Sequence, residues 1–141
     1  MGPMRQAFTT LRFATPGQGL IDITREVAAW AASTTIRDGL LSLLCRHTSA
    51  SLTIHENAAP AARRDVERWL ARIAPEGDGY EHDDEGPDDM PAHLRAVLTG
   101  ATLSIPVGAG RMRLGTWQGL FLCEHRAAPH RREVAAHLIG E

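Results

Sequence analysis

The sequence predicts an α+β fold, with mostly antiparallel or mixed sheets and two to three helices. Several strand-like segments follow one another in the second half of the chain, and helical segments are inserted between others. Runs of adjacent strands with inserted helices are typical of α+β proteins and not of an alternating βαβ order. The chain has 141 residues, of which 43% are hydrophobic and 23% charged, as in a globular domain. We therefore expect one domain over residues 1–141.

The first segments predict a strand, a helix and a second strand. Residues 5–13 predict a strand that ends in a Pro-Gly turn. A helix is expected from about Asp22 or Thr24 to Arg37, because apolar residues recur there at helical spacing. Residues 40–47 then predict a strand that is largely apolar on both faces.

The middle of the chain holds the clearest helical pattern. Residues 50–56 predict a strand, and a helix is expected from Pro60 to Ala74. Four apolar residues of this helix recur at i, i+3, i+4 and i+7 and should face the core, because these positions lie on one side of a helix. They are Val66, Trp69, Leu70 and Ile73.

A long acidic loop follows this helix. Eight acids and no arginine occur between Arg72 and Arg95, and glycines and prolines are interleaved with them. A loop of this length in a compact domain is usually functional or disordered. The alternative is an ordinary solvated segment, but His82 and His93 frame its second half and favour a site. The acids are Glu76, Asp78, Glu81, Asp83, Asp84, Glu85, Asp88 and Asp89.

A short helix is expected after the loop. Asp88 or Asp89 can cap its start, Pro91 lies in its first turn and Gly100 lies beyond its end. The apolar residues expected to face the core are Met90, Leu94, Val97 and Leu98.

The last segments predict strands. They cover residues 101–107, 111–114 and 117–126. Residues 132–139 fit either a last strand or a short helix, and the pair Ala135-Ala136 favours helix locally.

Composition excludes several functions. The net charge of −2 gives no support to a nucleic-acid partner. All 15 basic residues are arginine, which excludes a lysine Schiff base or a P-loop lysine. The apolar runs are too short for a membrane-spanning helix, so no membrane partner is expected. Two cysteines, no disulfide framework and no signal-peptide core lead us to expect a cytoplasmic protein.

The segment His47-Thr48-Ser49, followed later by Glu56-Asn57, is polar where a plain core would be apolar. His47 ends a buried strand, so it is either a hydrogen-bonded core residue or a functional imidazole. Thr48 and Ser49 offer hydroxyls and backbone amides that can hold a phosphate or carboxylate. The alternative for this pair is ordinary turn chemistry.

The second polar segment is the acidic loop itself. Its carboxylates and imidazoles can bind a divalent ion, either Mg²⁺ or Zn²⁺, although the spacing matches no standard zinc motif. His93 is expected near the core side of its helix, so a buried structural histidine is the alternative.

The third segment runs from Gly115 to Arg126. Within it, Cys123 and His125 repeat the Cys-x-His pattern of Cys45 and His47. A zinc site is one interpretation, and small buried cysteines are the commoner one. Glu124 lies beside two leucines, and a buried carboxylate there requires an arginine or another polar partner.

Together these segments resemble the YjbQ family, whose members are often described as secondary thiamine-phosphate synthases. The resemblance covers nearly the whole chain from about residue 5. Asp83 and Asp89 stand where asparagine is usual, and His55 stands where another polar residue is common. These differences add negative charge to the loop. The matching stretches are residues 47–50, 52–54, 56–57, 82–93, 104–107, 115–119 and 124–126.

The resemblance implies a compact α/β sandwich that assembles as a homotrimer, with the polar motifs near subunit interfaces. The implied activity joins a pyrimidine pyrophosphate to a thiazole phosphate, as a weak secondary activity, and gives thiamine phosphate and pyrophosphate. The expected partner is therefore a small phosphorylated metabolite. Two alternatives remain open: a metal-dependent hydrolase of a phosphorylated metabolite, and a metal- or metabolite-binding trimer without turnover.

Displacement of pyrophosphate requires charge neutralisation on the leaving group, by a metal, arginine or amide donors. The expected cofactor is accordingly a divalent metal, Mg²⁺ or Zn²⁺. The candidate catalytic residues are His47, His93, Glu124 and His125. The candidate substrate-binding residues are Thr48, Ser49, Asn57, Thr116, Gln118 and Arg126. The candidate metal ligands are His82, Asp84, Asp88, His93 and His125, with Glu124 as a further carboxylate for Mg²⁺.

Overall fold

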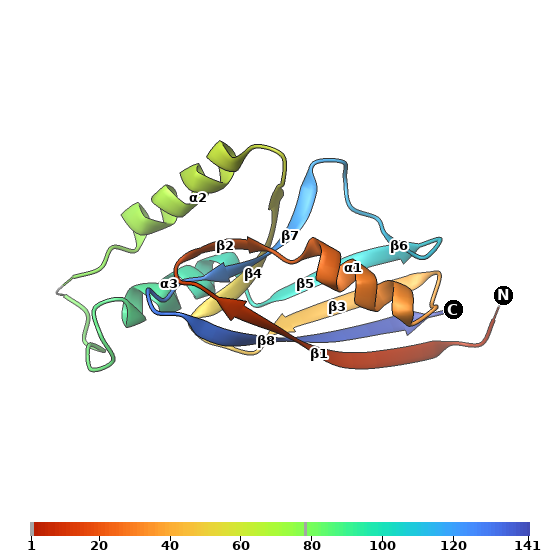
Figure 1. The fold of residues 1–141 in the computed structure, drawn as a ribbon. Helices are drawn as coiled ribbons and strands as arrows, with labels where there is room; N and C mark the ends of the chain where they lie inside the picture. The colour runs from red at the N-terminus through yellow and green to blue at the C-terminus, as the bar shows by residue number, and fades with distance from the viewer. Residues whose placement is uncertain (1, 78) are drawn as a thin grey trace.

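A computed structural model describes residues 2–77 and 79–141, so Asp78 of the acidic loop lies outside the described residues. The described part contains three helices and eight strands (Figure 1). The helices are α1 (Thr24–Ser33), α2 (Pro60–Ile73) and α3 (Asp89–Thr99). The strands are β1 (Arg5–Thr15), β2 (Gly19–Asp22), β3 (Gly39–Cys45), β4 (Ala50–Glu56), β5 (Thr102–Gly108), β6 (Arg111–Met112), β7 (Gln118–Glu124) and β8 (His130–Gly140).

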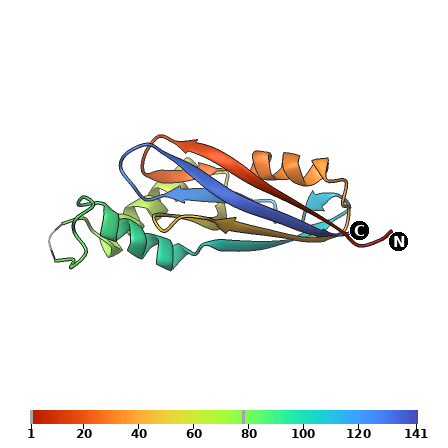
Figure 2. The ribbon, with the colours of Figure 1, turned by 90° about the horizontal axis from the view of Figure 1, so that it is seen from below.

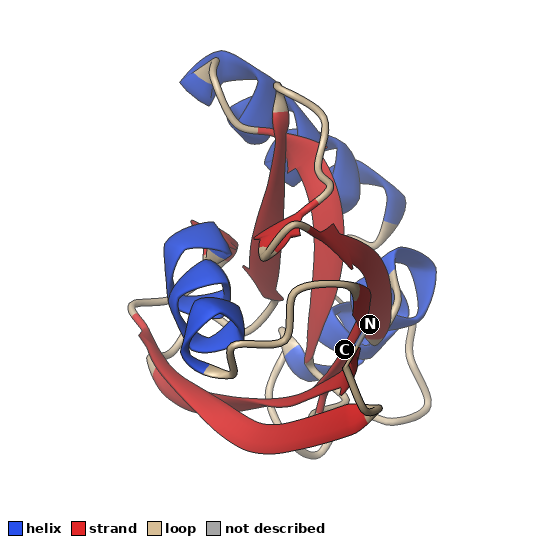
Figure 3. Cartoon of the chain, turned by 90° about the vertical axis from the view of Figure 1, so that its right-hand side faces the viewer, coloured by secondary structure: helices blue, strands red, loops and turns tan. Residues whose placement is uncertain are grey.

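The strands form two antiparallel sheets, which confirms the predicted α+β class. The larger sheet has the order β1-β8-β3-β5-β6, and the smaller has the order β2-β7-β4. Strands β1 and β8 are long and run side by side along their whole length (Figures 1 and 2). The larger sheet curves around α1 (Figure 3).

The main core lies between the inner face of the larger sheet, α1 and the smaller sheet. Leu41 of β3 and Leu138 of β8 are fully buried there against Val27 of α1 and Leu122 of β7. The opposite face of the smaller sheet carries Phe121 into a second cluster beneath α2. The smaller sheet is therefore covered on both sides, and the end of β7 reaches the region between α2 and α3.

The segment around residues 132–139 is a strand, not a helix. Its side chains alternate between buried and less buried positions from Arg132 to Leu138, and β8 pairs with both β1 and β3. Two neighbouring strands satisfy the backbone of this segment, and this pairing outweighs the local helix preference of Ala135 and Ala136.

Several predicted boundaries were wrong. Helix α1 ends at Ser33 rather than Arg37, because Thr35 adopts a positive φ of 61° that ends the helix. Strand β2 was not predicted, and β6 covers two residues instead of four. None of the described helices is long and apolar enough to cross a membrane.

Helix α2 has nearly the predicted bounds, but its apolar face is only partly covered. Leu70 is buried, whereas Trp69 and Ile73 are each 46% exposed. The predicted second apolar face of β3 is also open, since Leu40 and Leu44 point to the outside of the larger sheet.

Helix α3 reverses the predicted burial. Leu94, Val97 and Leu98 are exposed, and Val97 is 82% exposed. The buried side of α3 instead carries Asp89 and Arg95, with small apolar residues between them. The prediction that its leucines and valine face the core was wrong, because the inward side of α3 carries the charged side chains of Asp89 and Arg95.

Candidate functional site

Four side chains meet where the acidic loop joins the start of α3. Nε2 of His82 lies 3.0 Å from Oδ2 of Asp89 and 3.1 Å from Oε2 of Glu85. Nε2 of His93 lies 3.1 Å from the same Asp89 oxygen. One nitrogen or oxygen atom from each residue lies within 4.8 Å of the other three. We call His82, Glu85, Asp89 and His93 the loop–α3 group.

The orientation of His93 leaves one ring nitrogen for a cation. Its Nδ1 lies 2.8 Å from the backbone oxygen of Thr48, and a carbonyl can only accept a hydrogen bond. Nδ1 therefore carries the proton, and Nε2 of a neutral ring presents a lone pair to the Asp89 carboxylate. Two acceptors 3.1 Å apart require a proton or a metal ion between them.

Arg126 holds the loop–α3 group in place through hydrogen bonds to the acidic loop and to the start of α3. Its Nη1 donates to Oδ1 of the buried Asp89 at 2.8 Å, and its Nη2 donates to the backbone oxygen of Glu85 at 2.9 Å. Its Nε also donates to Asp88 at 3.0 Å. Burial pushes the pKa of Asp88 upward, but the backbone N–H of Ala127 and the Arg126 guanidinium outweigh burial and lower it. Asp88 thus serves as an anchor for Arg126.

The donor set of the loop–α3 group fits a transition-metal ion such as Zn²⁺ better than Mg²⁺. Two imidazole nitrogens suit zinc, whereas magnesium prefers oxygen ligands and bound water. Tetrahedral ligands about 2.0 Å from zinc lie about 3.3 Å from one another, close to the separations seen here. The hydrogen bonds of His93 to Thr48 and of Asp89 to Arg126 are the supporting contacts that metal ligands usually have.

The structure brings together some of the predicted metal ligands and separates others. His82 and His93 belong to the group, and Oδ1 of Asp84 lies 3.4 Å from Nδ1 of His82. Asp88 forms an ion pair with Arg126, and His125 forms a hydrogen bond with Ser51 outside the group. Glu85 and Asp89 were not among the predicted ligands. The spacing of Asp89 and His93 was the available signal, because residues four apart share one face of a helix.

Hydrogen bonds to the smaller sheet and to β8 hold the remaining predicted catalytic residues. His125 is buried, with Nε2 at 2.8 Å from Oγ of Ser51, and burial lowers its pKa to about 4. His47 is half-buried, burial lowers its pKa, and its Nε2 accepts the backbone N–H of Glu133. Neither imidazole belongs to the loop–α3 group.

Glu124 has the arginine partner that its burial requires. Nε and Nη2 of Arg132 both donate to its carboxylate, and Oγ1 of Thr15 donates at 2.6 Å. Nη2 of Arg132 also donates to Oγ of Ser49 at 3.0 Å, which ties one of the predicted substrate-binding hydroxyls to this buried pair.

Three predicted substrate-binding residues lie far from the loop–α3 group. The ladder of β4 and β7 pairs Ala50 with Glu124 at one end and Glu56 with Gln118 at the other, a span of about 20 Å. Asn57, Thr116 and Gln118 are exposed at the second end. Oε1 of Gln118 accepts the backbone N–H of Gly115 and so holds the turn around Thr116. Within one chain these residues and the loop–α3 group form two separate polar regions.

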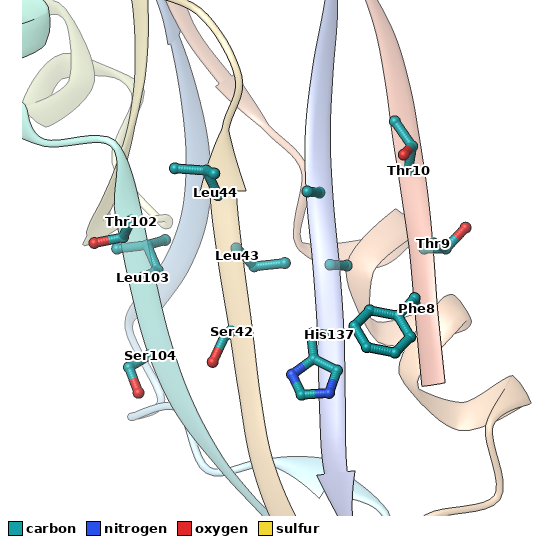
Figure 4. Close-up of a pocket in the computed structure, with 12 residues that line it drawn as sticks. Phe8, Thr9, Thr10, Ser42, Leu43, Leu44, Thr102, Leu103, Ser104 and His137 are labelled. Carbon is teal, nitrogen blue, oxygen red and sulfur yellow. The ribbon is translucent and has the colours of Figure 1, made fainter. Parts of the chain in front are cut away.

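Two cavities are informative about ligands. One of about 530 Å³ lies beside His93 and is lined by His47, Thr48 and Val97 among other, mostly small, residues. The larger one, about 730 Å³, lies on the outer face of the larger sheet, where Phe8 stacks on His137 (Figure 4). Its lining is mostly apolar or hydroxyl-bearing, so the cavity beside His93 is the better candidate for chemistry.

The fold and the loop–α3 group define an α+β protein with a candidate metal centre on a loop and a helix. The UPF0047 protein YjbQ-like family matches residues 9–141, and the chain belongs to this family. UPF0047 protein sll1880 of Synechocystis is 46% identical over 138 residues, covering 97% of this chain and 94% of that protein. UPF0047 protein YjbQ of Escherichia coli O157:H7 is 44% identical over 133 residues, covering 94% and 96%.

Solved structures agree with the fold. A YbjQ-like protein of unknown function from Sulfolobus solfataricus superposes with a TM-score of 0.91 at 24% identity, covering 99% of this chain and all of that one. The conserved hypothetical protein TT1486 from Thermus thermophilus gives a TM-score of 0.82 at 37% identity, covering 92% and 98%.

Proposed function

We propose that this protein is a metal-dependent enzyme that acts on a small phosphorylated metabolite. The observation that carries the proposal is the convergence of two imidazoles and two carboxylates, those of His82, Glu85, Asp89 and His93, within 4.8 Å of one another. A bound divalent ion supplies charge neutralisation for phosphate oxygens, which phosphoryl and pyrophosphoryl chemistry requires. The cavity beside His93 has room for the organic part of such a substrate.

The specific reaction we propose is the joining of a pyrimidine pyrophosphate to a thiazole phosphate. The thiazole nitrogen forms a bond to the methylene carbon of the pyrimidine, and the bond from that carbon to the pyrophosphate oxygen breaks. Pyrophosphate leaves with the electron pair, so its growing negative charge must be stabilised. Arg126 is engaged by Asp88 and Asp89, and we therefore assign it the holding of the metal ligands instead of direct contact with phosphate.

Hydrolysis of a phosphorylated metabolite is the second candidate. The observation that favours it is the openness of the loop–α3 group, since the side chain of His82 is 45% exposed. Water can therefore reach this group, and a divalent ion lowers the pKa of bound water into the neutral range.

The test begins with metal content, measured by mass spectrometry on protein purified without a histidine tag. Wild type should hold close to one equivalent of metal, and Asp89→Ala should lose most of it, because alanine has no side-chain oxygen to bind a metal. Asp65→Ala is the matched control, because Asp65 is exposed on α2 and contacts only Arg68 among its described ion-pair partners. Absence of metal from wild type, even after incubation with Zn²⁺ or Mn²⁺, would refute the metal centre.

Turnover is measured next with the metal-loaded protein. Thiamine phosphate and pyrophosphate formed from both substrates support the transferase, and phosphate released without thiazole phosphate supports the hydrolase. Both activities should fall at least about 100-fold in Asp89→Ala and stay unchanged in Asp65→Ala. Metal binding without either product would identify a metal-binding protein without these activities.

We also propose a homotrimer, on two observations. Exposed apolar residues gather on the outer face of the larger sheet and on α3. In addition, the polar region around Thr116 and Gln118 lies about 20 Å along the β4–β7 ladder from Glu124 within one chain, so neighbouring subunits can bring this region and the loop–α3 group together.

A further inference from the structure

A second polar cavity lies on the other side of α3 from the metal ligands. It has a volume of about 210 Å³ and lies between the start of β2, the helices α2 and α3, and the end of β7. Arg95 and His125 line it, and none of its lining residues belongs to the loop–α3 group. Arg95 is two residues beyond His93, about 200° around the helix axis, so one helix separates the two sites.

Arg95 is a buried cation on which the charges of Glu76 and Asp88 act only from beyond ion-pair distance. Its residue is 6% exposed, and its Nη2 donates to the backbone oxygen of Ala74 at 2.7 Å. Its Nε is buried and has no hydrogen-bond partner among the described residues. No carboxylate in residues 2–77 or 79–141 lies within ion-pair distance of this guanidinium. Because an unpaired buried charge is costly, this arginine indicates a missing anion.

A chain of hydrogen bonds sets the proton of His125. Oγ1 of Thr99 donates its hydrogen to the backbone oxygen of Arg95 at 2.8 Å. In its contact with Oγ of Ser51 it is therefore the acceptor, and Ser51 is the donor. Having donated its hydrogen, Ser51 accepts Nε2–H of His125 at 2.8 Å. The pKa of about 4 keeps this ring neutral near pH 7. Nδ1 of His125 therefore carries a lone pair, and among the described residues no donor reaches it.

The carboxylates of the cavity do not cancel Arg95. Glu124 is neutralised by Arg132, as described above. Glu67 also lines the cavity, and no described arginine forms an ion pair with it. A carboxylate at this position repels a fully deprotonated anion and tolerates one that still carries a hydrogen.

We propose that this cavity binds a small oxyanion that retains at least one proton, such as inorganic phosphate in its hydrogen phosphate or dihydrogen phosphate form. Arg95 donates to its oxygens, and Nδ1 of His125 accepts its hydroxyl proton. The cavity volume of about 210 Å³ admits a tetrahedral oxyanion. This site lies beyond the proposed metal chemistry and shares no residue with it.

Isothermal titration calorimetry with inorganic phosphate and with sulfate tests the proposal. Sulfate has the same shape but carries no proton at neutral pH, so it cannot donate to His125. Wild type should bind phosphate at least about 10-fold more tightly than sulfate. Arg95→Met should weaken phosphate binding at least about 10-fold, and the control Arg68→Met, which removes an exposed arginine of α2, should leave it unchanged.

Two further variants keep the test decisive. Glu67→Gln should tighten phosphate binding several-fold, and this holds even where Arg95→Met fails to fold. Asp89→Ala, which removes one carboxylate of the loop–α3 group, should retain phosphate binding. Equal affinity for sulfate, no phosphate binding by wild type, or loss in Asp89→Ala with retention in Arg95→Met would each overturn the proposal. The last result would instead locate phosphate at the metal centre.

Discussion

Glu124 carries a charge into the core, where both of its carboxylate oxygens have hydrogen-bond partners. Glu124 is 2% exposed, and burial alone would raise its pKa. Hydrogen bonds from Arg132 and Thr15 outweigh burial, and the pKa lies below its usual value. The carboxylate therefore stays charged at neutral pH. Breaking such a pair by removing one partner typically costs about 3–5 kcal/mol.

His125 gives a prediction on pH dependence at the same scale. Its pKa falls from 6.5 to about 4 on folding, so the unfolded chain binds its proton more readily between these values. Stability contributed by the neutral ring is complete above about pH 6.5 and is lost as the pH falls toward 4, by about 3 kcal/mol. His125→Gln should remove this part of the slope in urea unfolding measured from about pH 7 to 4.5.

The comparison with wild type isolates this one group, because the other titrating residues are the same in both proteins. His137→Gln, on the outer face of the larger sheet, controls for the loss of an imidazole. A slope that is identical in wild type and His125→Gln would contradict the assignment of a neutral buried ring.

At the scale of elements, the pairing of β3 with β8 depends on two glycines that face each other. Gly39 pairs with Gly140 in the register of these strands. A Cβ at Gly39 would overlap the backbone oxygen of Ile139, and backbone atoms cannot move aside without separating the strands. Gly39→Ala should therefore lower the free energy of unfolding by about 1–3 kcal/mol.

Gly108→Ala in β5 is the matched control for this prediction. A Cβ there meets only the flexible side chain of Arg113, so the change should cost less than Gly39→Ala. Thermal and urea unfolding of both variants measure the difference. Equal stability of the two variants would contradict the prediction and show that the backbone at the start of β3 can shift to accept a Cβ at Gly39.

The elements also show which features of the fold can be predicted from sequence. The apolar spacing of α2 predicted its bounds to within one residue, and the apolar segment 40–47 predicted β3 to within two residues. Helix α3 was located correctly but assigned the wrong buried face, because its inward residues are charged and serve the polar regions. For β8, local preference pointed to a helix, and the two neighbouring strands that decide its conformation are distant in sequence.

The candidate site was predictable in part for a similar reason. His82 and His93 could be chosen from the acidic loop, because imidazoles and carboxylates gather there in the sequence. Arg126 binds Asp89, and His125 lies on the other side of α3. Both placements depend on how the end of β7 packs against that helix. Contacts between such distant segments carry no local sequence pattern.

At the scale of the whole molecule, apolar surface is distributed unevenly. Leu40, Leu44 and Phe8 are exposed on the outer face of the larger sheet, and Val97 and Leu98 are exposed on α3. Apolar patches of this kind on a chain of 141 residues usually mark an interaction surface. Two different faces on one chain suit a ring, in which each subunit presents one face to its neighbour.

The proposed homotrimer therefore predicts how mass responds to charge on these faces. Wild type should have a mass near 46 kDa by light scattering, three times the 15.3 kDa of one chain. Val97→Glu or Leu44→Glu should shift the mass toward 15.3 kDa, because a buried unpaired carboxylate at an interface is costly. Ala61→Glu, at an exposed position of α2, is the control and should keep the wild-type mass. A monomeric wild type at micromolar concentration would refute the trimer, and it would confine catalysis to the loop–α3 group of a single chain.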